Sequence, residues 1–193
     1  AMLWPADPRG KALARLPAAV ERYLEPHRPR LEARSDQVGA IWRQMFRTET
    51  ATAPWRVIWS DLASRLRAAA LPDPAMVPLN SCYVTALPSA ERMYALAAWL
   101  NAAPIRALAR LGAEPAANNH ARFGARAVGR VPLPPTVLDL PLLTTLGRGP
   151  WSDATAAAID TLAAQRLDLT ASEQEAVDAF VAQDRLAAFE LQV

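Results

Sequence analysis

The stretch SAERMYALAAWLNAAPIRALARLG, residues Ser89–Gly112, carries the clearest structural pattern in the chain. Ser89 is a residue type that caps helices, and apolar side chains follow it at helical spacing. These apolar positions are Met93, Leu96 and Leu100. Pro104 is typical of the first turn of a helix, and Gly112 of a helix end. The pattern therefore predicts two consecutive helices with one apolar face.

Strand signals flank this helical pair. WRVIWSDLA, residues 55–63, contains consecutive β-branched and aromatic residues, and a second strand is expected around Leu79–Thr85. The turns between them are short, so we expect the two strands to pair in one sheet and the helix from Ser89 to pack on it. A third strand is expected around Ala125–Val131.

The two ends of the chain are expected to be helical. Residues 11–24 show helical spacing, and the two prolines of EPHRPRLEARS would break that helix. TETATAP, residues 48–54, is expected to be a loop. Near the C-terminus, Ser152 and the capping-box spacing of Thr170–Glu173 indicate two helices. The sequence thus predicts an α+β domain with a small mixed sheet and packed helices over residues 1–135. An acidic helical extension, residues 136–193, is expected to pack on it.

Charge divides the chain at the same point. Residues 1–135 hold 18 Lys and Arg against 10 Asp and Glu, whereas residues 136–193 hold 3 against 9. A basic body suggests an anionic partner, although the scarcity of lysine and the abundance of alanine also fit a GC-rich genome. Cys82 is the only cysteine, no apolar run approaches twenty residues and no export signal is evident. We therefore expect no membrane partner and a cytoplasmic location.

The usual catalytic motifs are missing. The only histidines, His27 and His120, lie far apart and have no cysteine or acidic cluster at metal-ligand spacing. There is no glycine-rich phosphate loop and no Gly-x-Ser-x-Gly elbow. We expect this chain alone to bind no metal or cofactor and to catalyse no reaction.

The residues that nucleic-acid binding requires are present in two clusters. Arginines bind phosphates and guanine edges, amide side chains bind adenine edges, and aromatic rings stack on bases. The first cluster is Arg43, Arg47, Trp55, Arg56 and Trp59. The second is Asn118, Asn119, His120, Arg122, Phe123, Arg126 and Arg130. We expect the three arginines of the second cluster to bind phosphates without local counter-charge, and Asn119 or His120 to lie nearer the base edges.

Two other interpretations stay open. Each of these residues taken singly is more often an ordinary surface or core residue, so the chain could be a protein-interaction module whose arginines only aid solubility. The same side chains would also serve unpaired bases of RNA. The arrangement after folding discriminates between these interpretations. A reader of duplex DNA is favoured if six arginines share one concave face, and the interaction module is favoured if they scatter. The six are Arg43, Arg47, Arg56, Arg122, Arg126 and Arg130.

A series of segments in a fixed order resembles a known family. The segments are YLEPHRPRLEAR (23–34), IWRQMFR (41–47), WRVIWSDLASRL (55–66), VPLNSCYVT (77–85), ERMYALAAWLNAAPIRALARL (91–111) and ARFGARAVGRVPLPP (121–135). They resemble the C-terminal target-recognition region of adenine-N6 DNA methyltransferases of the restriction-modification type. The matching motifs are Asn80–Tyr83, the pair Leu100-Asn101 and Val131–Pro134, whereas Ala102 stands where the family commonly has serine.

The resemblance implies a domain that binds double-stranded DNA and does not methylate it. The family's Asn/Asp-Pro-Pro-Tyr/Phe loop and glycine-rich loop, which serve methyl transfer from S-adenosylmethionine, do not occur here. A catalytic methyltransferase domain, in the same parent protein or as a partner, would supply both the cofactor and the chemistry.

Overall fold

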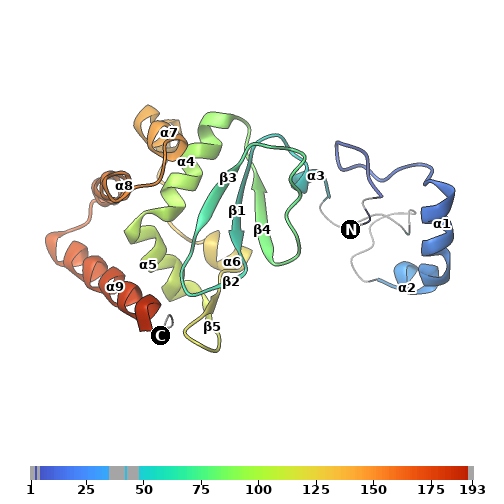
Figure 1. Cartoon of the computed structure of the whole chain (residues 1–193). Helices are drawn as coiled ribbons and strands as arrows, with labels where there is room; N and C mark the ends of the chain where they lie inside the picture. The colour runs from blue at the N-terminus through green and yellow to red at the C-terminus, as the bar shows by residue number, and fades with distance from the viewer. Residues whose placement is uncertain (1–2, 4, 35–41, 43–47, 191–193) are drawn as a thin grey trace.

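The N-terminal helices lie apart from the central sheet in this computed structural model, which describes residues 3, 5–34, 42 and 48–190 (Figure 1). They are α1 (Ala18–Leu24), the 3-10 helix η1 (Glu25–His27) and α2 (Arg28–Glu32). The first helix begins at Ala18 and not near residue 11, because Pro17 disfavours helical backbone in the residue before it and instead occupies the N-cap. The predicted break by the next two prolines is confirmed, since α1 ends at Leu24 and these prolines lie in the first turns of the new elements η1 and α2.

The central sheet has three antiparallel strands. β1 (Arg56–Ser60) lies between β3 (Ala68–Leu71) and β4 (Cys82–Ala86), with Trp59 opposite Tyr83. The predicted pairing of the first two strand segments is confirmed. β3 was not predicted, because its sequence AAAL favours helix over strand when taken alone. Just before β1, residues expected to be a loop form the short helix α3 (Thr48–Ala51).

Helix α4 (Ala90–Asn101) packs on this sheet, and α5 (Ala103–Gly112) packs against α4 (Figure 1). The Ser89 hydroxyl accepts a hydrogen bond from the Arg92 backbone N–H, and Pro104 lies in the first turn of α5, so both predicted helix starts are confirmed. Met93 and Leu100 are buried against the sheet, with Leu96 partly buried beside them, as the spacing predicted. The apolar face of α4 therefore forms the centre of the core.

Asn101 fastens the end of α4 to β3. Its side-chain oxygen accepts a hydrogen bond from the Ala68 N–H at 3.1 Å, and its amide nitrogen donates to the carbonyls of Ala68 at 2.7 Å and Ala97 at 2.8 Å. We expect Asn101→Ala to lower the free energy of unfolding by about 1–3 kcal/mol, because it leaves half-buried backbone groups without partners. Urea denaturation of the variant measures this loss, and an unchanged midpoint would contradict it.

A second small sheet joins β2 (Leu62–Ala63), β6 (Ala121–Arg122) and β5 (Glu114–Pro115), in the order β2-β6-β5. The prediction of a strand around residues 125–131 is wrong, because this segment begins with the short helix α6 (Ala125–Val128). The extended part of residues 118–135, which we call the basic stretch, lies earlier, at β6. The backbone here pairs with its neighbour along the chain, β5, and with β2, which is distant in sequence.

The C-terminal part packs on α4 and α5 and shares their core. It consists of the 3-10 helix η2 (Val137–Asp139), α7 (Pro141–Arg148), α8 (Asp153–Arg166) and α9 (Ala171–Glu190). Both predicted caps are confirmed, since the Ser152 hydroxyl accepts from the Thr155 N–H and Thr170 forms the capping box with Glu173. These hydrogen bonds hold the pKa of Glu173 below its ordinary value. Helix α7 was not predicted.

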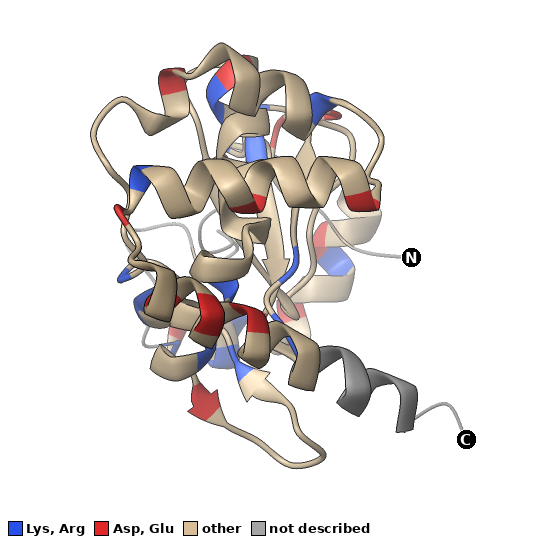
Figure 2. Cartoon of the chain, turned by 90° about the vertical axis from the view of Figure 1, so that its left-hand side faces the viewer, with Lys and Arg blue, Asp and Glu red and all other residues tan. Residues whose placement is uncertain are grey.

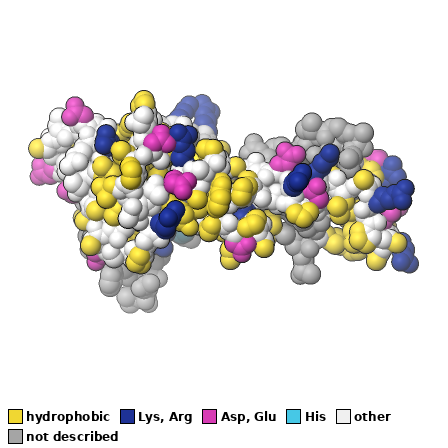
Figure 3. Space-filling model, turned by 90° about the horizontal axis from the view of Figure 1, so that it is seen from above, with side chains coloured by type: hydrophobic (Ala, Val, Ile, Leu, Met, Phe, Trp, Pro, Cys, Tyr) yellow, Lys and Arg dark blue, Asp and Glu magenta, His cyan; other side chains and the backbone are white. Residues whose placement is uncertain are grey.

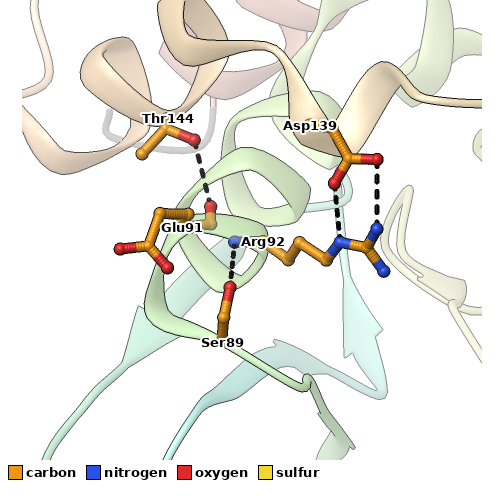
Figure 4. Close-up of polar contacts among 5 residues, drawn as sticks. All are labelled: Ser89, Glu91, Arg92, Asp139 and Thr144. Carbon is orange, nitrogen blue, oxygen red and sulfur yellow. Dashed lines mark hydrogen bonds and ion pairs between the residues drawn. The ribbon is translucent and has the colours of Figure 1, made fainter.

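Polar contacts hold η2 and α7 against the start of α4 (Figure 4). The Arg92 guanidinium donates two hydrogen bonds to the Asp139 carboxylate, at 2.7 and 3.0 Å, and the Thr144 hydroxyl donates to the Glu91 carbonyl at 3.2 Å. Gly147 allows α7 to approach closely, because a Cβ at this position would lie 2.1 Å from the Tyr94 carbonyl oxygen.

Candidate nucleic-acid interface

The asparagine pair of the basic stretch forms the turn of a β-hairpin. The His120 N–H donates to the Ala117 carbonyl at 3.2 Å, and Asn118 and Asn119 both have φ of 56°. This geometry is that of a type I′ turn, which joins β5 to β6 and favours asparagine because it tolerates left-handed backbone. The hairpin projects from the lower edge of the body (Figure 1). The two asparagines therefore have a structural reason to occupy an exposed tip.

Side chains around the turn make local hydrogen bonds. The Arg110 guanidinium donates to the backbone oxygen of Asn119 at 3.2 Å and to its side-chain oxygen at 3.1 Å. The ring Nδ1 of His120 lies 2.7 Å from the Asn118 carbonyl oxygen. Arg110 thus anchors the hairpin tip to α5, a role that sequence analysis missed because nothing in the local pattern links the two residues.

The three arginines of the basic stretch line one groove, which we call the arginine groove. Arg122, Arg126 and Arg130 are all exposed and border a cavity of about 840 Å³. The rest of its lining is Tyr83, Gly112, Glu114, Gly124, Ala125 and Ala127. The groove therefore combines β6 and α6 with the end of α5. This arrangement brings together the three cations that sequence analysis selected. They do not lie on one strand: Arg122 is in β6, Arg126 is in α6, and Arg130 is in the turn after α6.

Counter-charges within this groove differ from the expectation. Arg122 Nη1 forms an ion pair with the Asp61 carboxylate, and Glu114 lies opposite Arg122 in the β5–β6 pairing. The absence of local counter-charge is thus wrong for Arg122. Within the part of the chain that the structure describes, neither Arg126 nor Arg130 forms an ion pair or a side-chain hydrogen bond. These two guanidiniums remain available to an external anion.

Arg56 does not belong to this surface. It is fully buried, and its guanidinium donates hydrogen bonds to the backbone carbonyls of Ala51, Asp73 and, at 2.8 Å, Met76. Burial lowers the pKa of Arg56 from its ordinary value, and the nearby Asp73 partly offsets that effect. The assignment of Arg56 to DNA contact is corrected, because its donors already bind the protein's own backbone.

The rest of the first cluster packs in or against the core, with Trp55 partly buried, or lies outside the described residues. Trp59 is buried, and its indole N–H donates to the Phe123 carbonyl at 2.8 Å, while Phe123 is itself fully buried. Arg43 and Arg47 lie outside the residues that the structure describes. Trp59 and Phe123 therefore lie in the core and do not offer rings to a base.

Other faces of the molecule mix both signs of charge. Seen from above, basic and acidic side chains lie next to one another (Figure 3). Exposed ion pairs of the molecule include Arg92–Asp139 and Arg148–Glu91. Acidic positions lie along α9 in Figure 2. In the arginine groove, two of the three cations have no acidic partner among the described residues.

Comparison with known proteins identifies no relative, since no family model, curated protein or solved structure matches the chain significantly. In the described residues, no group of three or more His, Cys, Asp or Glu side chains is placed to hold a metal ion. None of the described helices has the length and apolar character needed to cross a membrane.

Proposed function

We propose that this chain is a DNA-binding target-recognition domain of an adenine-N6 DNA methyltransferase of the restriction-modification type. It would not methylate DNA by itself, because S-adenosylmethionine and the methyl-transfer residues would belong to a catalytic domain in the parent protein or in a partner. Such a protein would work on DNA in the cytoplasm. The observation that carries the proposal is the gathering of three exposed arginines on one groove beside a projecting hairpin.

The groove and the hairpin suit different parts of a DNA duplex. Arg126 and Arg130 present planar guanidinium donors that match phosphate oxygens, and Arg122 is held in place by Asp61. A two-stranded β-ribbon fits the width of the major groove, where amide side chains distinguish adenine. Asn118, Asn119 and His120, at or beside the hairpin tip, would then lie nearest the base edges.

The arrangement of the arginines favours this proposal over a protein-interaction module. Of the six arginines whose arrangement discriminates the two interpretations, Arg122, Arg126 and Arg130 border one cavity, as a reader of duplex DNA requires. Arg56 is buried and does not line that cavity, and Arg43 and Arg47 lie outside the described residues. The order of the motifs along the chain adds support, since the closing segment Val131–Pro134 follows the groove arginines directly.

A salt series of duplex titrations tests the proposal. Fluorescence anisotropy of a labelled 30-base-pair duplex, titrated with the full chain, should show binding whose log K falls linearly with log salt, by roughly 0.9 for each phosphate contact. A duplex and a single-stranded RNA of equal length should be compared. Absence of duplex binding at low salt, or tighter binding of the RNA, would refute the proposal.

Asn119→Gly separates base reading from turn formation. Glycine accepts the φ of 56°, so the turn should keep its backbone geometry and the hydrogen bond from Arg110 to the carbonyl of residue 119. The variant loses the amide group, and with it the second hydrogen bond from Arg110. We expect sequence preference at one base pair to relax by about 1–3 kcal/mol, measured by selecting bound duplexes from a randomised pool. Asn119→Ala is the matched control, since it also loses the amide but strains the turn by roughly 1–2 kcal/mol. If Asn119→Gly selects the same sequences as the parent, the amide reads no base.

A further inference from the structure

An apolar cavity of about 350 Å³ lies between the core face of β4 and the segment that follows β6. We call it the aromatic pocket. Its lining is Trp59, Tyr83, Val84, Thr85, Leu96, Trp99, Leu100, Ala125, Val128, Gly129, Val131 and Leu133. Its volume lies at the lower end of the range for small-molecule sites, roughly 300–1,000 Å³.

Hydrogen bonds to backbone carbonyls hold the two tryptophan side chains that line this pocket. The Trp59 indole N–H donates to the Phe123 carbonyl at 2.8 Å, and the Trp99 indole N–H donates to the Pro132 carbonyl at 2.9 Å. Tyr83 stacks on Trp59, with ring centroids 5.8 Å apart and planes 15° apart. Because both indole donors are already satisfied, the tryptophans contribute apolar surface to the pocket, which suits an apolar occupant.

The aromatic pocket adjoins the arginine groove. Tyr83 and Ala125 line both cavities, and Arg126 follows Ala125 directly in α6. The cations nearest this junction, Arg126 and Arg130, form no ion pair within the described residues. An apolar cavity therefore opens beside two guanidiniums that are free to bind an anion.

We propose that the two cavities form one binding site for a small amphipathic anion. The ligand's apolar part would fill the aromatic pocket with about ten carbon atoms, if each methylene takes the same volume as a water molecule in the liquid, roughly 30 Å³. Its carboxylate or phosphate monoester would bind Arg126 and Arg130, whose forked donors match both anions. This site goes beyond the proposed DNA binding and does not depend on it. Because Arg126 and Arg130 serve both, the anion would compete with DNA phosphates.

Three ligands with one chain length test the site without DNA. Decanoate, decyl phosphate and 1-decanol are titrated into the full chain and followed by calorimetry and by tryptophan emission, since Trp59 and Trp99 line the pocket. We expect one anion to bind per chain, at least tenfold more tightly than decanol, and the two anions to identify the preferred head group. Decanol binding as tightly as both anions, or no saturable anion binding, would overturn the proposal.

Two sets of variants assign the binding to each half of the site. Arg126→Ala/Arg130→Ala should weaken anion binding at least tenfold and leave decanol binding unchanged, while the control Arg9→Ala/Arg166→Ala, also at exposed arginines, should change neither. Thr85→Trp fills the pocket and should weaken all three ligands, and Leu133→Trp at its exposed rim serves if Thr85→Trp does not fold. Anion binding unaffected by the arginine pair or by the filling variant would contradict the assignment. If the parent chain binds no DNA, the proposed function fails, but the ligand titrations still decide whether this site exists.

Discussion

Replacement of Arg56 by alanine is expected to lower the free energy of unfolding by about 3–5 kcal/mol. The side chain is fully buried, and its guanidinium joins the end of α3 to the loop between β3 and β4 through the carbonyls of Ala51, Asp73 and Met76. Alanine would leave these carbonyls without their donor and would open a cavity beside β1. Urea denaturation of the full chain, followed by far-ultraviolet circular dichroism, measures the loss.

Arg67→Ala is the matched control for this prediction. Arg67 is exposed and lies next to β3, so its removal changes the net charge equally but should alter stability by less than about 0.5 kcal/mol. Arg56→Lys keeps a positive charge with fewer donors and should fall between the two. A loss for Arg56→Ala as small as that for Arg67→Ala would show that the buried network contributes little.

The triple variant Arg122→Ala/Arg126→Ala/Arg130→Ala is expected to bind duplex DNA on the order of 10²-fold to 10³-fold more weakly than the parent at constant salt. Each guanidinium can make charge-assisted hydrogen bonds to phosphate, and all three border one groove. Arg122 should contribute least, because it already pairs with Asp61. Anisotropy titration with one labelled duplex measures the change, and thermal unfolding checks that the variant is folded.

A variant with the same loss of charge separates local contact from general attraction. Arg9→Ala/Arg22→Ala/Arg166→Ala removes three exposed arginines that do not line the groove. We expect it to weaken binding by less than about tenfold, through the long-range field alone. If both triple variants weaken binding equally, the groove holds no phosphates and net charge alone explains the affinity.

The parts of the fold that sequence predicted are those with strong local patterns. The β-branched and aromatic residues of β1 and the capped, periodic helices α4 and α5 each carry their signal within a few residues. β3 consists of AAAL, whose alanines have no strand preference, so its place depends on β1 and on the side chain of Asn101. The strand conformation of β3 therefore depends on contacts with residues that are distant along the chain, which local sequence patterns do not reveal.

The candidate site was predictable in composition but not in geometry. Arginines spaced four apart align on one side of either a strand or a helix, so residues 122–130 could be assigned to one surface but not to the correct elements. The same reasoning could not separate Arg56, which fixes backbone carbonyls, from Arg126, which is exposed. Asp61 and Tyr83 reach the groove through strand pairing, which brings together residues that are distant along the chain.

The salt dependence of DNA binding by the parent and the groove triple variant tests the central claim most directly. Each phosphate contact that is lost should lower the magnitude of the slope of log K against log salt by roughly 0.9. We predict that Arg122→Ala/Arg126→Ala/Arg130→Ala has a slope whose magnitude is smaller by the equivalent of about two to three phosphate contacts. The control Arg9→Ala/Arg22→Ala/Arg166→Ala should keep the parent's slope. Equal slopes for the parent and the groove variant would show that Arg122, Arg126 and Arg130 do not bind DNA phosphates.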